Sequence, residues 1–516
     1  MKRRTQFACG LLLCLLAWGP RVAAVTAHRL HPDEALYGYW GLLILSGRDP
    51  WLTTVPAYKP PLLPYVLAGS LALLGRSELA VRLPGLLAGL AMVGLTGRLA
   101  WRLYHNPLVS LAAATVVALS PFALLFSATG FTDPLMVTLG LAGCLAAAER
   151  RPGWSGVLVG LSFAAKQTGV VWLPLAGLLS VVSEVRRANH EVRERRGWAR
   201  WIEPVWAARG FLLIVGLVLA WDRVRVLRGA DGFWRTGVVG YGGLRMIWSV
   251  EWAQRLRAWL GWLRYLLGSP LLDALLVGGA AMLVVRGARR QTWTAFFDLV
   301  LVGSCLVYLL AHWLWAFPVW DRYLLPLVPL AGMILGRVIS RLAEWAARSV
   351  IPPGWQRLAG AIALAAMMVC LAIPAGRAAA GQVPVGAGLT IYDGIEQVTA
   401  FLRGLPQGSV LYHHWLGWEY AFYLFDGPLY LAYWPTPAWL AEDVLAFGEA
   451  EPRYIVFPAW ESSARIEAAL AEVGYRLESR LEVRREEEVR FKVYRISKQQ
   501  IADPELQGAS SDGRRR

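Results

Sequence analysis

Long apolar runs dominate this sequence and restrict it to a small set of folds. Most of them approach the roughly 20 consecutive apolar residues that a helix needs to cross a lipid bilayer. The runs lie at about 7–25, 61–75, 84–103, 108–128, 134–149, 154–166, 168–184, 208–226, 271–286, 295–315, 324–340 and 358–376. With 56% hydrophobic and 17% charged residues, the composition is typical of a mainly α-helical polytopic membrane protein and excludes a soluble protein of this size.

Clusters of basic residues between the runs predict the orientation of the chain. The net charge is +16; in a membrane protein such an excess collects in cytoplasmic loops, so nucleic-acid binding is not expected. The clusters lie at 98–102, 150–151, 186–200, 286–290 and 341–357. They share one face only if the proline-rich run 61–75 does not cross. About eleven transmembrane helices then remain, with the N-terminus in the cytoplasm and the chain in the inner (plasma) membrane.

The N-terminal run admits two interpretations. Lys2, Arg3 and Arg4 precede the apolar residues 7–25, as they would in a signal peptide or in a first membrane helix. The run is long, contains Arg21, and lacks a convincing small-residue cleavage site. An uncleaved first helix is therefore preferred.

Two amphipathic segments are expected to lie along the membrane surface. In 33–47, apolar residues such as Leu36, Trp40 and Leu43 recur at helical spacing, and Asp33 is placed to cap the helix. The second segment, 252–266, is rich in Trp and Arg. Both are predicted to be interfacial helices.

The character of the sequence changes after residue 376. Helix-like pieces lie at 392–405, 437–447 and 462–473, strand-like pieces at 410–412 and 454–457, and a hairpin within 475–496. This alternation predicts a small α/β domain at 390–496, and the odd number of crossings places it outside the cytoplasm. Residues 1–376 are predicted to form the transmembrane domain, and the polar residues 502–516 a disordered tail.

Several ionisable residues fall on the outer face in this topology. They are the adjacent carboxylates Asp33 and Glu34, followed by Lys59, Asp133 and Lys166. Charge at a membrane boundary is costly, so ionisable groups there indicate a functional site. Acids and cations on one face suggest chemistry on a lipid-linked phosphate.

These residues stand in short motifs with a defined order. The motifs are Asp33-Glu34, Lys59-Pro60-Pro61-Leu62-Leu63, Val81-Arg82-Leu83-Pro84, Thr132-Asp133-Pro134-Leu135, Ala165-Lys166 and Asp321-Arg322-Tyr323-Leu324-Leu325-Pro326. With this order the chain resembles the GT-C class of membrane glycosyltransferases over about residues 1–376. It is most similar to the protein O-mannosyltransferase superfamily and to the aminoarabinose transferases that act on lipid A.

The resemblance implies a reaction and roles for individual residues. Members of the class take a sugar from a polyprenyl-phosphate carrier and pass it to an acceptor outside the cytoplasm. By resemblance, Asp33 is the catalytic carboxylate, Asp133 is a second acidic residue of the site, and Lys59 lies near the lipid phosphate. Lipid A transferases carry Glu before Lys-Pro-Pro, whereas this chain has Tyr58. No metal ligand is therefore predicted, and dependence on a divalent metal is left open.

The chemistry supports roles for the carboxylates. Inverting transfer needs a base that takes the proton of the acceptor as the acceptor attacks the anomeric carbon. A carboxylate whose pKa is raised by partial desolvation and by a neighbouring carboxylate suits this work. Asp33 is predicted to be that base, with Glu34 as its helper and Asp133 as a catalytic or acceptor-binding group. The alternative for Asp33 and Asp133 is a helix cap, and Thr132-Asp133-Pro134 is a good capping sequence.

The departing phosphate needs cations that stabilise its charge. The predicted donor-phosphate residues are Lys59, Lys166, Arg322 and Arg82. Their alternative is contact with lipid headgroups at the interface. Tyr58 and Tyr323 are predicted to stack on the sugar or to pack against the carrier lipid, with plain interface aromatics as the alternative. His28, His31 and His312 are interpreted as solvated or capping side chains in preference to metal ligands.

Two other functions compete with sugar transfer. A transporter or lipid flippase also places charges along a membrane path, but no internal repeat is seen and the charges gather at one face. A non-catalytic scaffold would keep its function without the Asp33 carboxylate. The leading prediction is a polyprenyl-phosphate-sugar-dependent hexosyl- or pentosyltransferase, whose partners are the lipid-linked donor, membrane lipid, and an acceptor that the sequence does not name.

Overall fold

The structure is a computed structural model that describes residues 3–188, 199–240, 245–289, 292–349, 356–386, 389–485 and 487–499. Its internal contacts divide the chain into two compact units. The first contains Met1–His28 and Tyr37–Gly388, and the second contains Arg29–Leu36 and Leu389–Arg516. The predicted tail at 502–516 and most of the basic loop at 186–200 lie outside the described residues.

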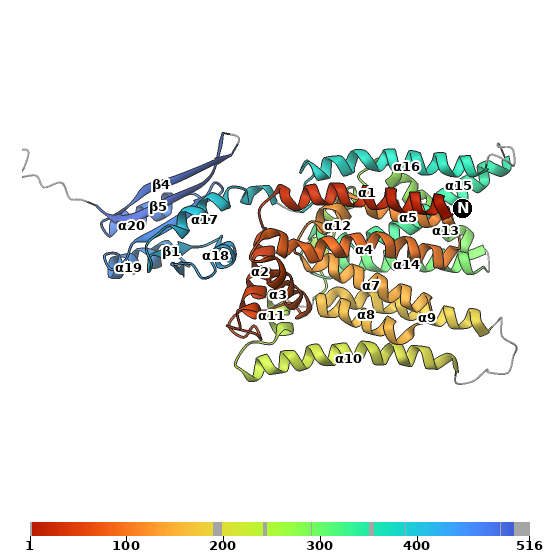
Figure 1. Ribbon diagram of the computed structural model, residues 1–516, viewed down its shortest axis with the longest axis horizontal. Coiled ribbons are helices and arrows are strands. Elements are labelled where there is room, and N and C mark those ends of the chain that lie inside the picture. The colour runs from red at the N-terminus through yellow and green to blue at the C-terminus, as the bar shows by residue number, and fades with distance from the viewer. Residues whose placement is uncertain are drawn as a thin grey trace, which may run out of the picture. The chain divides into compact units, whose positions relative to one another are not determined.

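The first unit is built of helices. They are α1 (Arg3–Ala27), α2 (Pro32–Leu45, which begins in the second unit), α3 (Leu62–Leu74), α4 (Glu78–Tyr104), α5 (Pro107–Leu119), α6 (Pro121–Ser127), α7 (Thr132–Ala148), α8 (Pro152–Ala165), η1 (Gln167–Val171), α9 (Trp172–Ala188), α10 (Ala199–Leu227), α11 (Phe233–Gly240), η2 (Ser249–Glu251), α12 (Trp252–Leu263), α13 (Pro270–Arg289), α14 (Trp293–Leu314), η3 (Asp321–Leu324), α15 (Leu327–Ser349) and α16 (Gln356–Ala379). Figure 1 shows the long helices of this unit side by side, with α3 and α11 at one end of the bundle.

The helices confirm the prediction of a mainly α-helical polytopic membrane protein. Among the described residues, five helices are long and apolar enough to span a membrane: Glu78–Tyr104, Pro204–Leu227, Pro270–Arg289, Trp293–Leu314 and Leu358–Ala379. Others are apolar but shorter, such as α7 with 17 residues and α8 with 14. The count of about eleven crossings therefore stays a prediction, as does the expectation that the 13-residue α3 does not cross.

The run 108–128, predicted as a single helix, is broken at Ser120. α5 and α6 are bent by 56° relative to each other, and Pro121 opens α6. Proline has no N–H group, so the carbonyl of Val117 loses its usual helical donor. The buried guanidinium of Arg21 takes over, donating to Val117 O at 2.8 Å and to Ala118 O at 2.7 Å. Arg21 of α1 thus stabilises the break between α5 and α6.

Small residues let two membrane helices approach closely. A Cβ atom on Gly160 of α8 would lie 2.7 Å from the Ile214 Cβ of α10, and one on Gly156 would collide with the Ala207 carbonyl oxygen. Glycine at these two positions removes the side-chain atoms that would separate the backbones, as is usual where helices pack within a bilayer. This packing holds α8, which carries one of the predicted site residues at its end, against α10.

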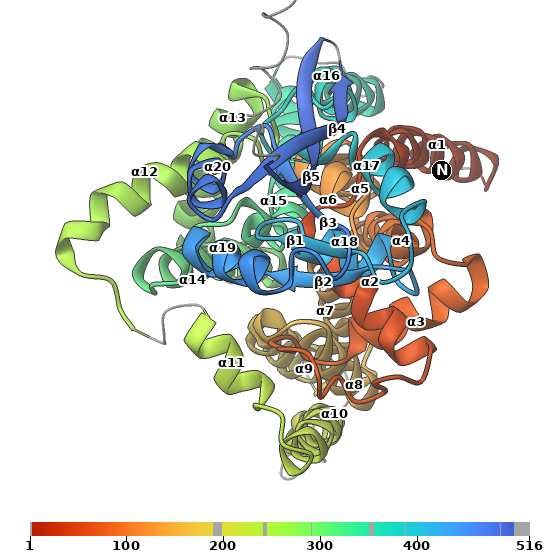
Figure 2. The same cartoon turned by 90° about the vertical axis from the view of Figure 1, so that its left-hand side faces the viewer.

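The second unit is an α/β unit, as the alternating sequence predicts. Its elements are η5 (Leu389–Tyr392), α17 (Ile395–Arg403), β1 (Val410–His413), α18 (Gly417–Tyr423), β2 (Tyr430–Tyr433), α19 (Pro437–Phe447), β3 (Arg453–Pro458), α20 (Ala464–Glu472), β4 (Tyr475–Arg485) and β5 (Glu488–Lys498). The strand order is β2-β1-β3-β5-β4, with β1 parallel to β2 and β3 and the remaining pairs antiparallel. Figure 2 shows β2 and β4 at the two edges.

The core of this unit forms where helices α19 and α20 pack against the sheet. Buried residues such as Leu440, Ile455 and Leu470 belong to one hydrophobic cluster. The predicted strands, hairpin and helices are confirmed, with shifts of up to three residues at their ends. The short β2 and α18 are additional elements that the sequence interpretation did not include.

The segment Arg29–Leu36 belongs to the second unit although it lies early in the chain. The backbone N–H of Arg29 donates to Asp393 Oδ1 at 2.9 Å, and that of Leu30 donates to the Tyr423 hydroxyl at 3.3 Å. The ring of His31 meets that of Tyr392 edge-on, with the centroids 5.8 Å apart. These contacts attach the start of α2 to the α/β unit.

Candidate functional site

A buried ion pair connects α7 and the end of α8. Lys166 is the C-cap of α8 and has an extended backbone. Its Nζ lies 2.5 Å from Asp133 Oδ1, and both side chains are at most 3% exposed. Asp133 stands in the first turn of α7, where the helix dipole favours a negative charge. It does not cap the helix as its sequence suggests, because the N-cap residue is Phe131 and no side chain makes a capping bond there.

An aromatic ring covers the cation of this pair. Lys166 Nζ lies 4.3 Å from the centroid of the Tyr323 ring, which is within the range of a cation–π interaction. The backbone oxygen of Tyr323 accepts a hydrogen bond of 2.5 Å from the Tyr308 hydroxyl. Tyr323 is thus held from α14 while its ring faces the lysine.

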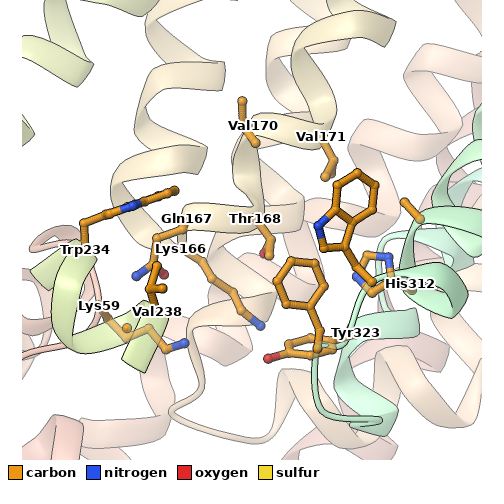
Figure 3. Close-up of a pocket in the computed structure, with 14 residues that line it drawn as sticks. Lys59, Lys166, Gln167, Thr168, Val170, Val171, Trp234, Val238, His312 and Tyr323 are labelled. Carbon is orange, nitrogen blue, oxygen red and sulfur yellow. The ribbon is translucent and has the colours of Figure 1, made fainter. Parts of the chain in front are cut away.

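Lys59 and Lys166 line one cavity of about 530 Å³. Its walls are mainly apolar and include Val170, Val171, Trp234, Val238, Ala311, Trp315 and Phe317. Figure 3 shows both lysine side chains reaching into the cavity, with Tyr323 beside the end of Lys166. Two ammonium groups in an apolar cavity suit a ligand that is anionic at one end and apolar at the other.

The loop that carries Lys59 is fixed to the turn that carries Lys166. Gln167 Nε2 donates a hydrogen bond of 2.6 Å to the backbone oxygen of Tyr58. Lys59 itself is buried, and its Nζ lies 4.9 Å from the centroid of the Tyr58 ring. Gln167 was not singled out from the sequence; its place directly after Lys166 was the only available signal.

An Asp49-centred turn organises the beginning of the same loop. Its carboxylate accepts hydrogen bonds from the backbone N–H and the hydroxyl groups of Thr53 and Thr54, at 2.7–3.1 Å. Burial raises the pKa of Asp49, but the bonds from Thr54 and Thr53 outweigh this effect and leave the pKa below its ordinary value. The carboxylate therefore stays ionised and keeps the loop folded.

Arg322 lies beside the residue that precedes α7. Its Cζ is 4.9 Å from the centroid of the Phe131 ring and 5.3 Å from that of Trp320. The carboxylate of the neighbouring Asp321 accepts two hydrogen bonds of 2.7 Å, one from the backbone N–H of Arg322 in the same η3 turn and one from the backbone N–H of Gly386. Burial raises the pKa of Asp321. The structure thus brings the Asp-Arg-Tyr motif to the beginning of α7.

Arg82 makes contacts that differ from those expected of a donor-phosphate residue. Its Nη1 donates to Val25 O and to His28 O, both at 2.7 Å. These are carbonyl groups at the C-terminus of α1, where a cation is favoured. Arg82 is buried, and its assignment to the donor phosphate stays a prediction.

Known proteins share this arrangement of helices. ArnT from Cupriavidus metallidurans in the apo state superposes with a TM-score of 0.63 at 15% identity, and the match covers 95% of this chain and 98% of ArnT. The structure of the same protein bound to undecaprenyl phosphate also matches with a TM-score of 0.63 at 15% identity, over 94% of this chain and 97% of ArnT. The chain has the ArnT fold. An oligosaccharyltransferase from Archaeoglobus fulgidus, in a complex with zinc and sulfate, matches with a TM-score of 0.50 at 11% identity, over 91% of this chain and 67% of that protein.

A sequence comparison adds a second, independent similarity. The sequence model of the dolichyl-phosphate-mannose-protein mannosyltransferase family matches residues 58–199, a segment that includes Lys59, Asp133 and Lys166. No curated protein sequence matches the chain. With the ArnT fold, this match supports the resemblance to GT-C membrane glycosyltransferases predicted from the motif order.

Asp33 and Glu34 belong to the second unit. The N-cap of α2 is formed by His31: its Nδ1 accepts from Asp33 N at 3.1 Å, and Glu34 Oε2 accepts from His31 N at 2.9 Å. This reciprocal arrangement is that of a capping box. The cap expected from Asp33 is therefore supplied by His31 and Glu34. The convergence of Asp33 with Lys59, Asp133 and Lys166 stays a prediction.

His312 lies at the wall of the cavity and is not solvated. Its ring stacks on that of Tyr308 with 4.1 Å between centroids, and its Nδ1 lies 3.0 Å from Tyr308 O. Within the described residues, no group of three or more His, Cys, Asp or Glu side chains is arranged to hold a metal ion. The chemistry proposed next is derived for the protein side chains.

Proposed function

We propose that this protein is an integral membrane glycosyltransferase that moves a sugar from a polyprenyl-phosphate carrier to an acceptor outside the cytoplasm. The observation that carries the proposal is the mainly apolar cavity into which Lys59 and Lys166 extend. Its apolar walls suit an isoprenoid chain and its cations suit a phosphate. A protein of the same fold, ArnT from Cupriavidus metallidurans, has been solved with undecaprenyl phosphate.

The charges of the cavity match those of such a donor. Lys59 and Lys166 place positive charge at the cavity, and a sugar linked through a phosphodiester carries about one negative charge. When the bond between the sugar and the phosphate breaks, a second negative charge develops on the departing phosphate. Lys59 and Lys166, with Arg322 near the start of α7, stabilise that charge. Tyr58 and Tyr323 contact the sugar or the carrier.

Asp33 serves as the base. Its carboxylate accepts the proton from a hydroxyl or amino group of the acceptor as that group attacks the anomeric carbon. The bond between the anomeric carbon and the phosphate oxygen breaks with inversion, and its electron pair leaves on the polyprenyl phosphate. Glu34 supports Asp33 by bonding the N–H of His31, which keeps the first turn of α2 in place.

The membrane topology belongs to the same proposal. The N-terminus lies in the cytoplasm, the chain crosses the inner (plasma) membrane, and the second unit lies outside the cytoplasm, on the side of the acceptor. Cysteines placed at the exposed positions Ser46 and Arg151, in a chain without its native cysteines, test this arrangement. A reagent that cannot cross the membrane labels Ser46→Cys from outside and does not label Arg151→Cys; the reverse result overturns the topology.

Sugar transfer is tested with the full chain in proteoliposomes. Labelled mannose and a labelled pentose, each on polyprenyl phosphate, are offered with lipid, peptide and glycan acceptors. We expect transfer by the wild type and a loss of about 10²–10⁴-fold in Asp33→Asn, the range for removing a general base. Equal transfer by both proteins rejects the role of Asp33. Movement of the donor across the bilayer without transfer identifies a flippase instead.

A further inference from the structure

Glu419 is a buried carboxyl group without a hydrogen-bond partner. It lies in α18 of the second unit with 0% of its surface exposed. Neither carboxyl oxygen has a hydrogen-bond partner on another residue, and no cation is paired with the carboxyl group among the described residues. An ionised carboxylate in such a place costs far more free energy than a neutral one. Burial accordingly raises the pKa of Glu419 to about 8, so the group holds its proton at neutral pH.

The face of α18 that carries Glu419 is the face that meets the start of α2. Residues four apart lie on one side of a helix, so Glu419 and Tyr423 share a face. The Tyr423 hydroxyl accepts the hydrogen bond from Leu30 N, and Asp33 follows three residues later. The buried carboxyl and the predicted catalytic carboxylate are therefore neighbours within the second unit.

The electrostatic effects of the two carboxyl groups agree with this placement. The charge of Asp33 adds to burial in raising the pKa of Glu419. Burial raises the pKa of Tyr392 as well, and both Glu419 and Asp33 contribute to that shift. Tyr392 also contacts the ring of His31, which caps α2. Asp33, Glu419 and Tyr392 thus share one local environment.

Other titratable groups face the same region. On α18 itself, burial raises the pKa of Tyr420, with further contributions from Glu419 and Glu461. From β1, the ring of His413 lies 6.3 Å from that of Tyr420. Before α17, the carboxylate of Asp393 is paired with Arg485 at 3.1 Å. None of these groups is hydrogen-bonded to the Glu419 carboxyl.

We propose that Glu419 is a positioning residue for Asp33, holding its proton so that Asp33 alone carries the negative charge of the pair. The proposal rests on the proposed role of Asp33 as the base. Two neighbouring carboxyl groups do not both ionise readily, and the deeper burial of Glu419 selects it as the neutral one. Ionisation of Glu419 would put a second negative charge beside the reaction centre, where the departing phosphate also gains charge, and would slow transfer.

The pH dependence of transfer tests the proposal. We compare the wild type, Glu419→Gln and, as a matched control, Glu461→Gln in proteoliposomes between about pH 6 and pH 9.5. We expect wild-type transfer to fall above about pH 8, by about tenfold one pH unit higher. Glu419→Gln, which stays neutral, keeps wild-type transfer at pH 7 within about threefold and loses the alkaline decline. Glu461→Gln should retain the alkaline decline of the wild type. An alkaline decline that persists in Glu419→Gln overturns the proposal.

An infrared titration of the full chain tests, independently of sugar transfer, whether Glu419 holds a proton and senses the charge of Asp33. The wild type should show a protonated carboxyl band that disappears near pH 8 and is absent from Glu419→Gln. In Asp33→Asn, which removes the neighbouring charge, the band should disappear at a lower pH. If the band is absent from the wild type, or if its midpoint is the same in Asp33→Asn, the pairing is rejected. If the band behaves as expected but no sugar is transferred, only the proposed function fails.

Discussion

Lys166 and Asp133 form a buried ion pair, with Nζ and Oδ1 2.5 Å apart, between the end of α8 and the first turn of α7. Burying two charges costs several kcal/mol for each ion, which only close contact between them offsets. A pair of purely structural value would be replaceable by apolar residues. In the proposed site it has another purpose, since it holds an ammonium group at the wall of the donor cavity.

Replacing one partner of this pair should destabilise the protein more than replacing both. Asp133→Asn leaves the buried ammonium without its carboxylate, and Lys166→Met leaves the carboxylate without its cation. Each should lower the free energy of unfolding by about 3–5 kcal/mol, measured in detergent by thermal or denaturant unfolding. The double variant Lys166→Met/Asp133→Leu should regain most of this stability and still transfer no sugar. Recovery of transfer in the double variant would show that the pair is only structural.

Gln167 should affect transfer through the position of Lys59. In Gln167→Leu, the carbonyl of Tyr58 loses the 2.6 Å hydrogen bond, and the loop before α3 is no longer fixed to the Lys166 turn. We expect a loss of about 1–2 kcal/mol of stability and a rise of about tenfold in the KM for the lipid-linked donor. Thr168→Val, which changes the next residue along the same cavity wall, is the control. An equal effect of both substitutions would contradict a specific role of Gln167.

The sequence predicted elements that depend on neighbouring residues better than contacts between residues far apart in the chain. Apolar runs specify helices locally, and alternating residues specified β1, β3 and the β4–β5 hairpin. The contacts of Arg82 with Val25 O and His28 O have no local signal in the sequence, because these partners lie 54 or more residues away. The break between α5 and α6 was not predicted, although Pro121 was a local signal for it, and the stabilisation of the break by Arg21 had no local signal.

In the second unit, too, some elements and contacts could not be predicted from the sequence pattern. β2 is a short strand of mostly exposed residues, so it has no apolar pattern that predicts it. The neighbourhood of Glu419 and Asp33 depends on attachment of Arg29–Leu36 to elements that come more than 350 residues later. No spacing in the sequence reports such contacts, because burial and pairing at long range are decided by packing.

Arg21 should contribute much more to stability than an exposed arginine of the same unit. Arg21→Met removes hydrogen bonds to Ala17 O, Val117 O and Ala118 O and leaves Val117 O without a donor. We expect a loss of about 3 kcal/mol in unfolding free energy. The control is Arg98→Met: the Arg98 side chain is 63% exposed and pairs with Glu149 at 2.9 Å, so its loss should cost about 1 kcal/mol or less. Equal midpoints of unfolding for the two variants would refute the role of Arg21 at the α5–α6 break.

The stability of the second unit should fall in acid because of His413. Burial lowers the pKa of this β1 residue to about 4, with a smaller contribution from the neighbouring His414, and its Nδ1 has no hydrogen-bond partner. The folded pKa lies below the ordinary value of 6.5, so the unfolded state binds the proton first as the pH drops. The stabilisation is present above about pH 6.5 and is lost as the pH falls towards 4, with an upper limit of about 3 kcal/mol.

Hydrogen exchange of the full chain measures this effect. Amides of β1 and α18, corrected for the chemical exchange rate, should open more readily at about pH 4.5 than at pH 7 in the wild type. In His413→Asn the titrating group is absent, and the difference between the two pH values should shrink. A pH effect of the same size in both proteins would assign acid sensitivity to other groups. A wild type with equal protection at the two pH values would show that the buried imidazole is already charged or is solvated.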